Sequence, residues 1–228
     1  MQAGLIMITG ASSGIGAAVA CRFSQAGHPL ALLARRLAPM EALALPQSAC
    51  VAVDVVDGVA VAAALAETES QWGPCVGLVN CAGFIKTGAF HDVALEDHAA
   101  MVQVNLMGVI NSMNAVLPGM RARGDGTIIN ISSTADRHPR PHIATYAASK
   151  AAVKSLTESL RADNASYGVR IALLAPAKVA TPMLLSSDLP QDQLIQVDEV
   201  AEAVYWMFQQ PKHFCVRDLV VAPTGFVP

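Results

Sequence analysis

The stretch Leu5–Gly16 reads L-I-M-I-T-G-A-S-S-G-I-G and joins a short apolar run to a glycine-rich turn. The run Leu5–Thr9 shows no polar alternation, which is typical of a strand buried on both faces. A helical pattern, Ile15–Ala26, follows the glycines. Glycines between a strand and a helix let the backbone approach a pyrophosphate, which N–H groups at the helix N-terminus can bind. The spacing G-x-x-x-G-x-G therefore predicts dinucleotide binding, with a plain tight turn as the alternative. The turn residues expected to contact the dinucleotide are Gly10, Ser12, Ser13, Gly14, Ile15 and Gly16.

Short apolar runs alternate with helical patterns along the whole chain. The expected strands are Leu5–Thr9, Pro29–Ala34, Cys50–Asp54, Val76–Asn80, Thr127–Ser132, Val169–Ala175 and Leu219–Ala222. The expected helices are Ile15–Ala26, Val59–Trp72, Leu95–Arg123, Tyr146–Tyr167 and Glu199–Gln209. Four glycines stand just past a helix, where C-terminal caps belong: Gly27, Gly73, Gly124 and Gly168. The alternation predicts one α/β domain over residues 1–228, a Rossmann-like, doubly wound parallel sheet of about seven strands with helices on both faces.

Composition limits the class of protein. The 228 residues are 53% hydrophobic and 14% charged, yet no uninterrupted apolar run reaches the length of a membrane span. The apolar N-terminus leads straight into the glycine turn, so we expect no signal peptide. Five scattered cysteines without C-x-x-C spacing predict reduced thiols in a cytoplasmic protein, and they argue against a disulfide framework or a metal site. A net charge of −3 without a basic stripe gives no indication of a nucleic-acid partner.

The second and third expected strands end in residues that would read the adenosine half of a dinucleotide. An acidic side chain after the second strand suits a free ribose 2′-hydroxyl, whereas an arginine suits a 2′-phosphate. Here Arg35 and Arg36 follow the strand and no carboxylate does. They favour NADP(H) over NAD(H), with solvated arginines as the alternative. Asp54, which precedes Val55, could bind the adenine amino group or cap the next helix.

A tyrosine and a lysine share one predicted helix. Tyr146 precedes Lys150 by four residues, which places both side chains on one helical face. A neighbouring ammonium favours the phenolate and lowers a tyrosine pKa by roughly 1–3 units in comparable ion pairs. Ser133 supplies a hydroxyl thirteen residues before the tyrosine. The spacing Y-x-x-x-K is common by chance, so it indicates proton-transfer chemistry only together with the other motifs.

Taken together, these motifs resemble the short-chain dehydrogenase/reductase family over essentially the full chain. The family's N-N-A-G stretch stands at 80–83 with Cys81 in place of the second asparagine, and its P-G-x-x-x-T stretch stands at 176–181 with Ala177 in place of glycine. Its mid-helix asparagine falls on Asn105. The resemblance adds these expected cofactor contacts: Asn80, Ala82, Gly83, Tyr146, Lys150, Pro176, Val179 and Thr181.

The resemblance also implies residue roles. Tyr146 would be the general acid when a carbonyl is reduced and the base when an alcohol is oxidised. Lys150 would lower the tyrosine pKa and hydrogen-bond the nicotinamide ribose. Ser133 would polarise the substrate oxygen, and Asn105 would hold a water in a proton relay. A homodimer or homotetramer is expected, because the two long helices pair across a two-fold axis in this family.

The substrate is the least determined part of this prediction. The loop after Ser133 is polar and basic, and it could orient a carboxylate, as in relatives acting on short 3-hydroxy acids, or form a solvated rim. Its residues are Asp136, Arg137, His138, Pro139, Arg140, Pro141 and His142. The segment Pro182–Gln196, with the apolar residues Met183, Leu184 and Leu185, is short for a substrate lid and favours an open or small pocket.

We therefore predict an NADP(H)-dependent oxidoreductase that transfers a hydride between the nicotinamide and a carbonyl or secondary alcohol. Its substrate would be a small ketone, aldehyde, 3-hydroxy acid or semialdehyde, and no membrane partner is expected. The alternative is a non-catalytic, NADP(H)-binding redox sensor with the same fold. Sensors of that kind typically lose the tyrosine or the lysine, and Tyr146 and Lys150 are both present.

Overall fold

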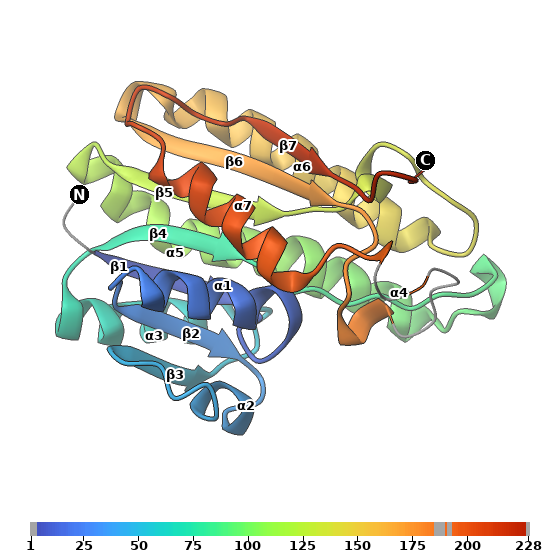
Figure 1. The fold of residues 1–228 in the computed structure, drawn as a ribbon, viewed down its shortest axis with the longest axis horizontal. Helices are drawn as coiled ribbons and strands as arrows, with labels where there is room; N and C mark the ends of the chain where they lie inside the picture. The colour runs from blue at the N-terminus through green and yellow to red at the C-terminus, as the bar shows by residue number, and fades with distance from the viewer. Residues whose placement is uncertain (1–3, 185–189, 191–192, 227–228) are drawn as a thin grey trace.

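Seven parallel strands form a single sheet in the order β3-β2-β1-β4-β5-β6-β7 (Figure 1). The computed structural model describes residues 4–184, 190 and 193–226. The strands are β1 Leu5–Thr9, β2 Leu30–Ala34, β3 Ser48–Ala52, β4 Cys75–Asn80, β5 Gly126–Ile131, β6 Val169–Pro176 and β7 Asp218–Val221. The order reverses between β1 and β4, and in open parallel sheets ligands bind beyond the carboxyl ends of the strands at such a point. The predicted fold class is confirmed.

Helices cover both faces of the sheet, and the side chains of β1 show how. Ile6 and Ile8 point into one apolar core, whereas Leu5 and Met7 point into the other, as the twofold period of a strand requires. The first core lies under α1 Gly14–Gln25 and α7 Val197–Gln209, which pack against each other. The second lies under α3 Gly58–Trp72, α5 Gly108–Arg123 and α6 Ala144–Asn164, behind the sheet in Figure 1.

Several boundaries differ from the sequence prediction for local reasons. Strand β3 ends at Ala52, so Asp54 lies in the loop beyond it and not at the strand end. Helix α7 begins two residues before the expected Glu199, because Gln196 and Glu199 form a reciprocal capping box. The four-residue helix α2, Ala38–Glu41, was not predicted.

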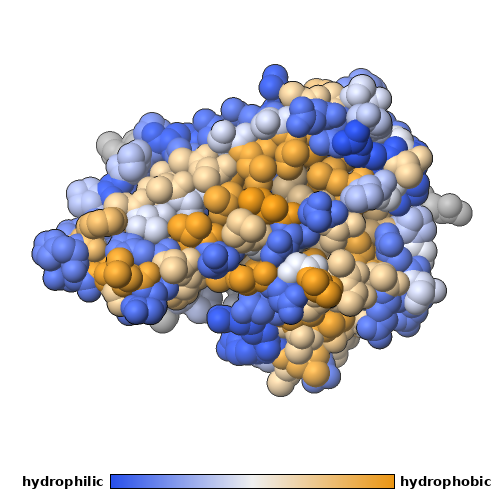
Figure 2. Space-filling model, turned by 180° about the vertical axis from the view of Figure 1, so that it is seen from behind, coloured by the Kyte–Doolittle hydropathy of each residue, from blue (hydrophilic) through white to orange (hydrophobic). Residues whose placement is uncertain are grey.

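The expected helix Leu95–Arg123 is continuous but not uniform. It consists of α4 Leu95–Val102, a π-helical turn at Gln103–Met107, and α5. By length and composition alone it could cross a membrane, since its mean hydropathy reaches 1.3. Its contacts are those of a covering helix, because α5 packs on α3 and β4. Seen from behind, apolar side chains gather over the middle of this face (Figure 2).

Candidate active site

The glycine turn between β1 and α1 has no room for larger side chains. Gly10 adopts a φ of +68° and Gly14 a φ of +55°, both in the left-handed region that favours glycine. A Cβ on Gly10 would lie 2.7 Å from the backbone nitrogen of Ala82, and one on Gly16 would collide with the Gly10 carbonyl oxygen. Ser13, the residue just before α1, makes no side-chain capping bond. The turn therefore brings the backbone close to whatever occupies the cleft beside it.

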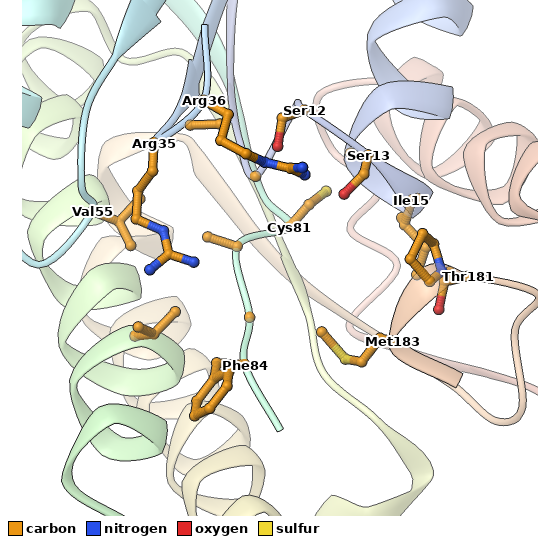
Figure 3. A pocket seen from close by; sticks show the side chains of 18 of the residues that line it. Ser12, Ser13, Ile15, Arg35, Arg36, Val55, Cys81, Phe84, Thr181 and Met183 are labelled. Atoms are coloured by element: carbon orange, nitrogen blue, oxygen red, sulfur yellow. The ribbon is translucent and has the colours of Figure 1, made fainter. Parts of the chain in front are cut away.

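That cleft is a cavity of about 680 Å³ at the carboxyl ends of β1, β2 and β4 (Figure 3). Its lining includes these predicted cofactor residues: Gly10, Ser12, Ser13, Gly14, Ile15, Gly16, Arg35, Arg36, Asp54, Val55, Ala82, Gly83 and Thr181. Most of the predicted cofactor contacts thus come together at one place, although they come from segments far apart in the sequence. Asn80, Pro176 and Val179 are not among the lining residues of this cavity.

The two arginines after β2 reach into the cleft with their guanidinium groups (Figure 3). Both residues are exposed, and no ion pair involves Arg35 or Arg36 within the described part of the chain. Guanidinium groups without a protein carboxylate are suited to an anionic ligand, and above all to a phosphate.

Asp54 lines the same cleft and does not cap the next helix. Its Oδ1 accepts a hydrogen bond from the backbone N–H of Val56 at 3.1 Å. The cap of α3 is Asp57, which accepts bonds from two backbone N–H groups of the first helical turn. The capping role considered for Asp54 is therefore wrong, because the N–H that it binds belongs to the loop before α3.

A buried ladder of polar side chains connects the glycine turn to α6. The Asn80 amide donates to Asn130 Oδ1 at 2.8 Å, and the Asn130 amide donates to Thr157 Oγ1 at 2.8 Å. Thr9 Oγ1 accepts from the Ala82 backbone N–H at 3.3 Å at the other end. Asn80 therefore supports the turn from below instead of lining the cavity. Sequence reasoning missed Asn130, although an asparagine inside an apolar strand was a visible signal.

Three reactive side chains meet beyond β5. Ser133 follows the strand, and its hydroxyl lies near enough to the phenol of Tyr146, in the first turn of α6, to lower the pKa of that phenol. The Lys150 ammonium donates to the Ile131 carbonyl at 2.9 Å and lies 5.9 Å from the centre of the Tyr146 ring. The helix and the strand end therefore place these three groups together, as predicted.

The electrostatics of this group differ from the expectation. Burial raises the pKa of Tyr146, while the hydrogen bond from Ser133 and the positive charge of Arg140 oppose that rise. Lys150 is not among the groups that lower it, because its ammonium is directed at the Ile131 carbonyl. Burial lowers the pKa of Lys150 itself to about 8. At neutral pH the phenol therefore holds its proton and is ready to act as an acid.

Asn105 lies in the π-helical turn and is fully buried. Its Oδ1 accepts from the Phe84 N–H at 2.7 Å, and its amide donates to the Phe84 carbonyl at 2.9 Å and to Ser149 Oγ at 3.0 Å. Ser149 in turn donates to the Tyr146 carbonyl at 2.7 Å. The amide thus holds the loop after β4 against α6. Both of its hydrogens are engaged, so a water at Asn105 would have the second lone pair of Oδ1 or the backbone as partners.

A second cavity of about 380 Å³ contains the reactive group and adjoins the first. Ser133, Tyr146 and Lys150 line it, and so do the predicted residues Pro176 and Val179. Residues common to both cavities are Ile15, Cys81, Gly83, Ile85, Thr181 and Met183. The two cavities therefore form one continuous cleft, with the phenol beyond the end of the glycine-lined part.

The two departures from the family motifs line the second cavity, and so do described residues of the segment after Thr181. Cys81 is at the boundary between the cavities, where burial raises the pKa of its thiol to about 12. The Ala177 N–H donates to the Val221 carbonyl at 2.8 Å, which secures this segment to β7. Met183 and Leu184 line the second cavity, whereas Leu185 lies outside the described residues.

The basic loop after Ser133 contributes less to the cavity than its composition indicates. Arg137 pairs with Asp136 at 2.6 Å and with Asp218 at 2.9 Å, so it ties the loop to β7. Of the basic residues in this loop, Arg140 is the one among the lining residues of the second cavity. The charge available to a substrate therefore comes from one arginine of this loop.

Comparison with known proteins connects this geometry to a family. A family model described as short chain dehydrogenase matches residues 4–192. Sulfoacetaldehyde reductase 2 from Chromohalobacter salexigens is 35% identical over 237 residues, covering 96% of this chain and 94% of that protein. Glycine betaine reductase ATRR from Emericella nidulans is 33% identical over 233 residues. The alignment covers 95% of this chain and only 18% of that longer protein.

Solved structures share the whole fold. The closed form of a serine dehydrogenase complexed with NADP+ superposes with a TM-score of 0.88 at 28% identity, covering 95% of this chain and 94% of the other. A 3-ketoacyl-(acyl-carrier-protein) reductase from Brucella melitensis complexed with NADH superposes with a TM-score of 0.90 at 28% identity, covering 97% of each chain. Proteins of this shape thus bind either nicotinamide dinucleotide.

Proposed function

This chain belongs to the short-chain dehydrogenase family, and on that premise we propose that it is an NADP(H)-dependent reductase of small carbonyl compounds. One observation carries the proposal. Ser133, Tyr146 and Lys150 together line a small cavity that adjoins the glycine-lined cleft. A proton donor and a dinucleotide site in one continuous cleft are what a carbonyl reduction requires.

The residues of the larger cavity fit a nicotinamide dinucleotide. The backbone of the glycine turn would bind the pyrophosphate, since Gly10 and Gly14 leave no side chain in its way. Arg35 and Arg36 would bind a 2′-phosphate, which favours NADP(H) over NAD(H). When bound, the reduced nicotinamide supplies a hydride to the substrate carbon.

The chain's own side chains would manage the substrate oxygen and its proton. The Ser133 hydroxyl would hydrogen-bond the carbonyl oxygen and orient it toward Tyr146. Tyr146, protonated at neutral pH because burial raises its pKa, would donate the proton as negative charge develops on that oxygen. Lys150, whose ammonium is held at the Ile131 carbonyl, would hydrogen-bond the nicotinamide ribose. In the direction of alcohol oxidation Tyr146 would act as the base.

The size of the second cavity supports a proposal for the substrate, and the exposed side chains of the long helices support one for the assembly. A cavity of about 380 Å³ suits a small ketone, aldehyde, 3-hydroxy acid or semialdehyde. Relatives named for sulfoacetaldehyde and serine act on molecules of that size. A homodimer or homotetramer would pair the long helices, whose exposed side chains include Leu95 and Val102. We place such an enzyme in the cytoplasm.

Oxidation of NADPH at 340 nm against ketones, aldehydes and semialdehydes tests the proposal. Tyr146→Phe removes the proton donor and keeps the ring, so we expect turnover to fall by about a hundredfold or more. The dissociation constant of NADPH, measured by fluorescence, should change little. Near wild-type turnover in this variant would refute the mechanism. Bound NADPH without turnover of any carbonyl would instead support a redox sensor.

A further inference from the structure

The cavity that contains Tyr146 has positive charge that the proposed reaction does not use. Arg140 and Lys178 line it, and none of its lining residues in the described ranges is an aspartate or glutamate. We propose that the substrate is a short carbonyl compound with an anionic group at its far end, and that Arg140 binds this group with Lys178 as a second cation. The inference rests on the proposed function and specifies its substrate class.

The two arginines of the loop differ in their partners. Arg137 contacts the carboxylates of Asp136 and Asp218, and Asp136 also accepts a hydrogen bond from Ser132 Oγ at 2.7 Å. The acidic group of this loop is therefore already engaged. Arg140 forms no ion pair with any described residue, and the ring of Phe226 lies 5.9 Å from its guanidinium carbon. Arg140 is exposed and lines the cavity without a carboxylate partner among the described residues.

The loop restrains the backbone around Arg140 before any ligand binds. On one side the two ion pairs of Arg137 join the loop to β7. On the other side the carbonyl of His142 accepts a hydrogen bond from the Gly88 N–H at 3.0 Å. Pro139 and Pro141 flank Arg140 and restrict the backbone dihedral angles around it. A cation on a stiff segment loses less conformational entropy on binding than one on a mobile loop.

A substrate that reaches both Tyr146 and Arg140 needs a short apolar segment between its carbonyl and its anionic group. Arg140 is near enough to Tyr146 for its charge to lower the pKa of the phenol. Aliphatic side chains occupy much of the remaining wall, among them Ile85, Ile143 and Met183. A carbonyl at Ser133, a short aliphatic spacer and an anionic end group would therefore meet matching surfaces in turn. A planar guanidinium pairs well with a carboxylate, a sulfonate or a phosphate.

The experiment compares two aldehydes of the same shape with NADPH and the full chain. Succinic semialdehyde ends in a carboxylate, and 4-oxobutanamide ends in a neutral amide. We expect Arg140→Gln to lower kcat/KM for the carboxylate by about 10- to 100-fold, mostly through KM, because a charge-assisted hydrogen bond is lost. The amide should show a much smaller change. Lys178→Gln should also lower kcat/KM for the carboxylate aldehyde, by a smaller factor.

Lys212→Gln is the matched control. It removes the same charge from an exposed side chain that pairs with Asp125 at 3.1 Å, just before β5, at the end of the strand opposite Ser133. It should leave the preference between the two aldehydes unchanged. Wild-type protein that uses the amide as efficiently as the carboxylate would overturn the inference. An equal loss of both activities in Arg140→Gln would overturn it as well.

A binding measurement separates this inference from the proposed function. If neither aldehyde is turned over, the proposed function fails, and calorimetric titration with butyrate and butyramide then decides on the anion site. Butyrate that binds wild-type protein more tightly than butyramide, and that loses this advantage in Arg140→Gln, supports the site. Equal binding of both compounds, or butyrate binding unaffected by the substitution, refutes it.

Discussion

The buried ammonium of Lys150 should cost the fold stability at neutral pH. The residue is 5% exposed, and burial lowers its pKa from 10.5 to about 8. Below about pH 8 the folded chain carries this buried charge. Between about pH 8 and 10.5 the folded state releases the proton while the unfolded state keeps it. The unfolded state then binds more protons, so stability rises with pH across this window.

The size of the effect follows from the same pKa. A fall from 10.5 to about 8 corresponds to roughly 3 kcal/mol of destabilisation at neutral pH. Replacing the lysine by methionine removes the charge, but it also leaves the Ile131 carbonyl without its 2.9 Å donor, a loss of about 1 kcal/mol. We therefore expect Lys150→Met to be about 2 kcal/mol more stable than wild type at pH 7.

Urea unfolding without added nucleotide, followed by circular dichroism at pH 7, 8.5 and 10, measures this difference. The advantage of Lys150→Met should shrink as the pH rises through the window, while its reductase activity is lost at every pH. Lys154→Met lies one turn further along α6 and controls for the change in net charge. A variant less stable than wild type at pH 7, or a difference that does not change with pH, would refute the reasoning.

Two further predictions concern the cofactor cleft and its support. Arg35→Ala and Arg36→Ala should each weaken NADPH binding by about tenfold or more and NADH binding far less, because NADH has no 2′-phosphate to lose its arginine partner. Fluorescence titration with both nucleotides checks this, and equal losses for the two nucleotides would contradict it. Asn130→Leu should lower the free energy of unfolding by about 2–4 kcal/mol, because the Asn80 amide loses its acceptor inside the core. Thr157→Val removes the acceptor at the other end of the ladder and should lower the free energy of unfolding by a smaller amount. If Asn130→Leu unfolds in urea at the same concentration as wild type, the ladder contributes little to stability.

Sequence patterns specified most of the fold and the members of the site. Short continuous apolar runs are typical of strands buried on both faces, and their alternation with helices favours a parallel sheet. The glycine turn is equally local, because Gly10 and Gly14 adopt backbone angles that other residues disfavour. The four-residue spacing of Tyr146 and Lys150 needs only helical geometry to place both on one face.

What each side chain contacts was decided by packing between distant segments. Lys150 donates to Ile131, nineteen positions earlier, and not to the tyrosine that its spacing indicated. Asn80 and Asn130 meet because β4 and β5 are neighbours, which no local pattern specifies.

Packing between distant segments also decided which arginine of the basic loop has a carboxylate partner. Arg137 and Arg140 look alike in the sequence, but Asp218, eighty-one positions away, engages the first and leaves the second to the cavity. Local backbone preferences are encoded residue by residue and can be read from the chain. The pairing of polar groups depends on which strands become neighbours and on how much water is excluded. Both are decided only when the strands assemble into the sheet and the helices cover it.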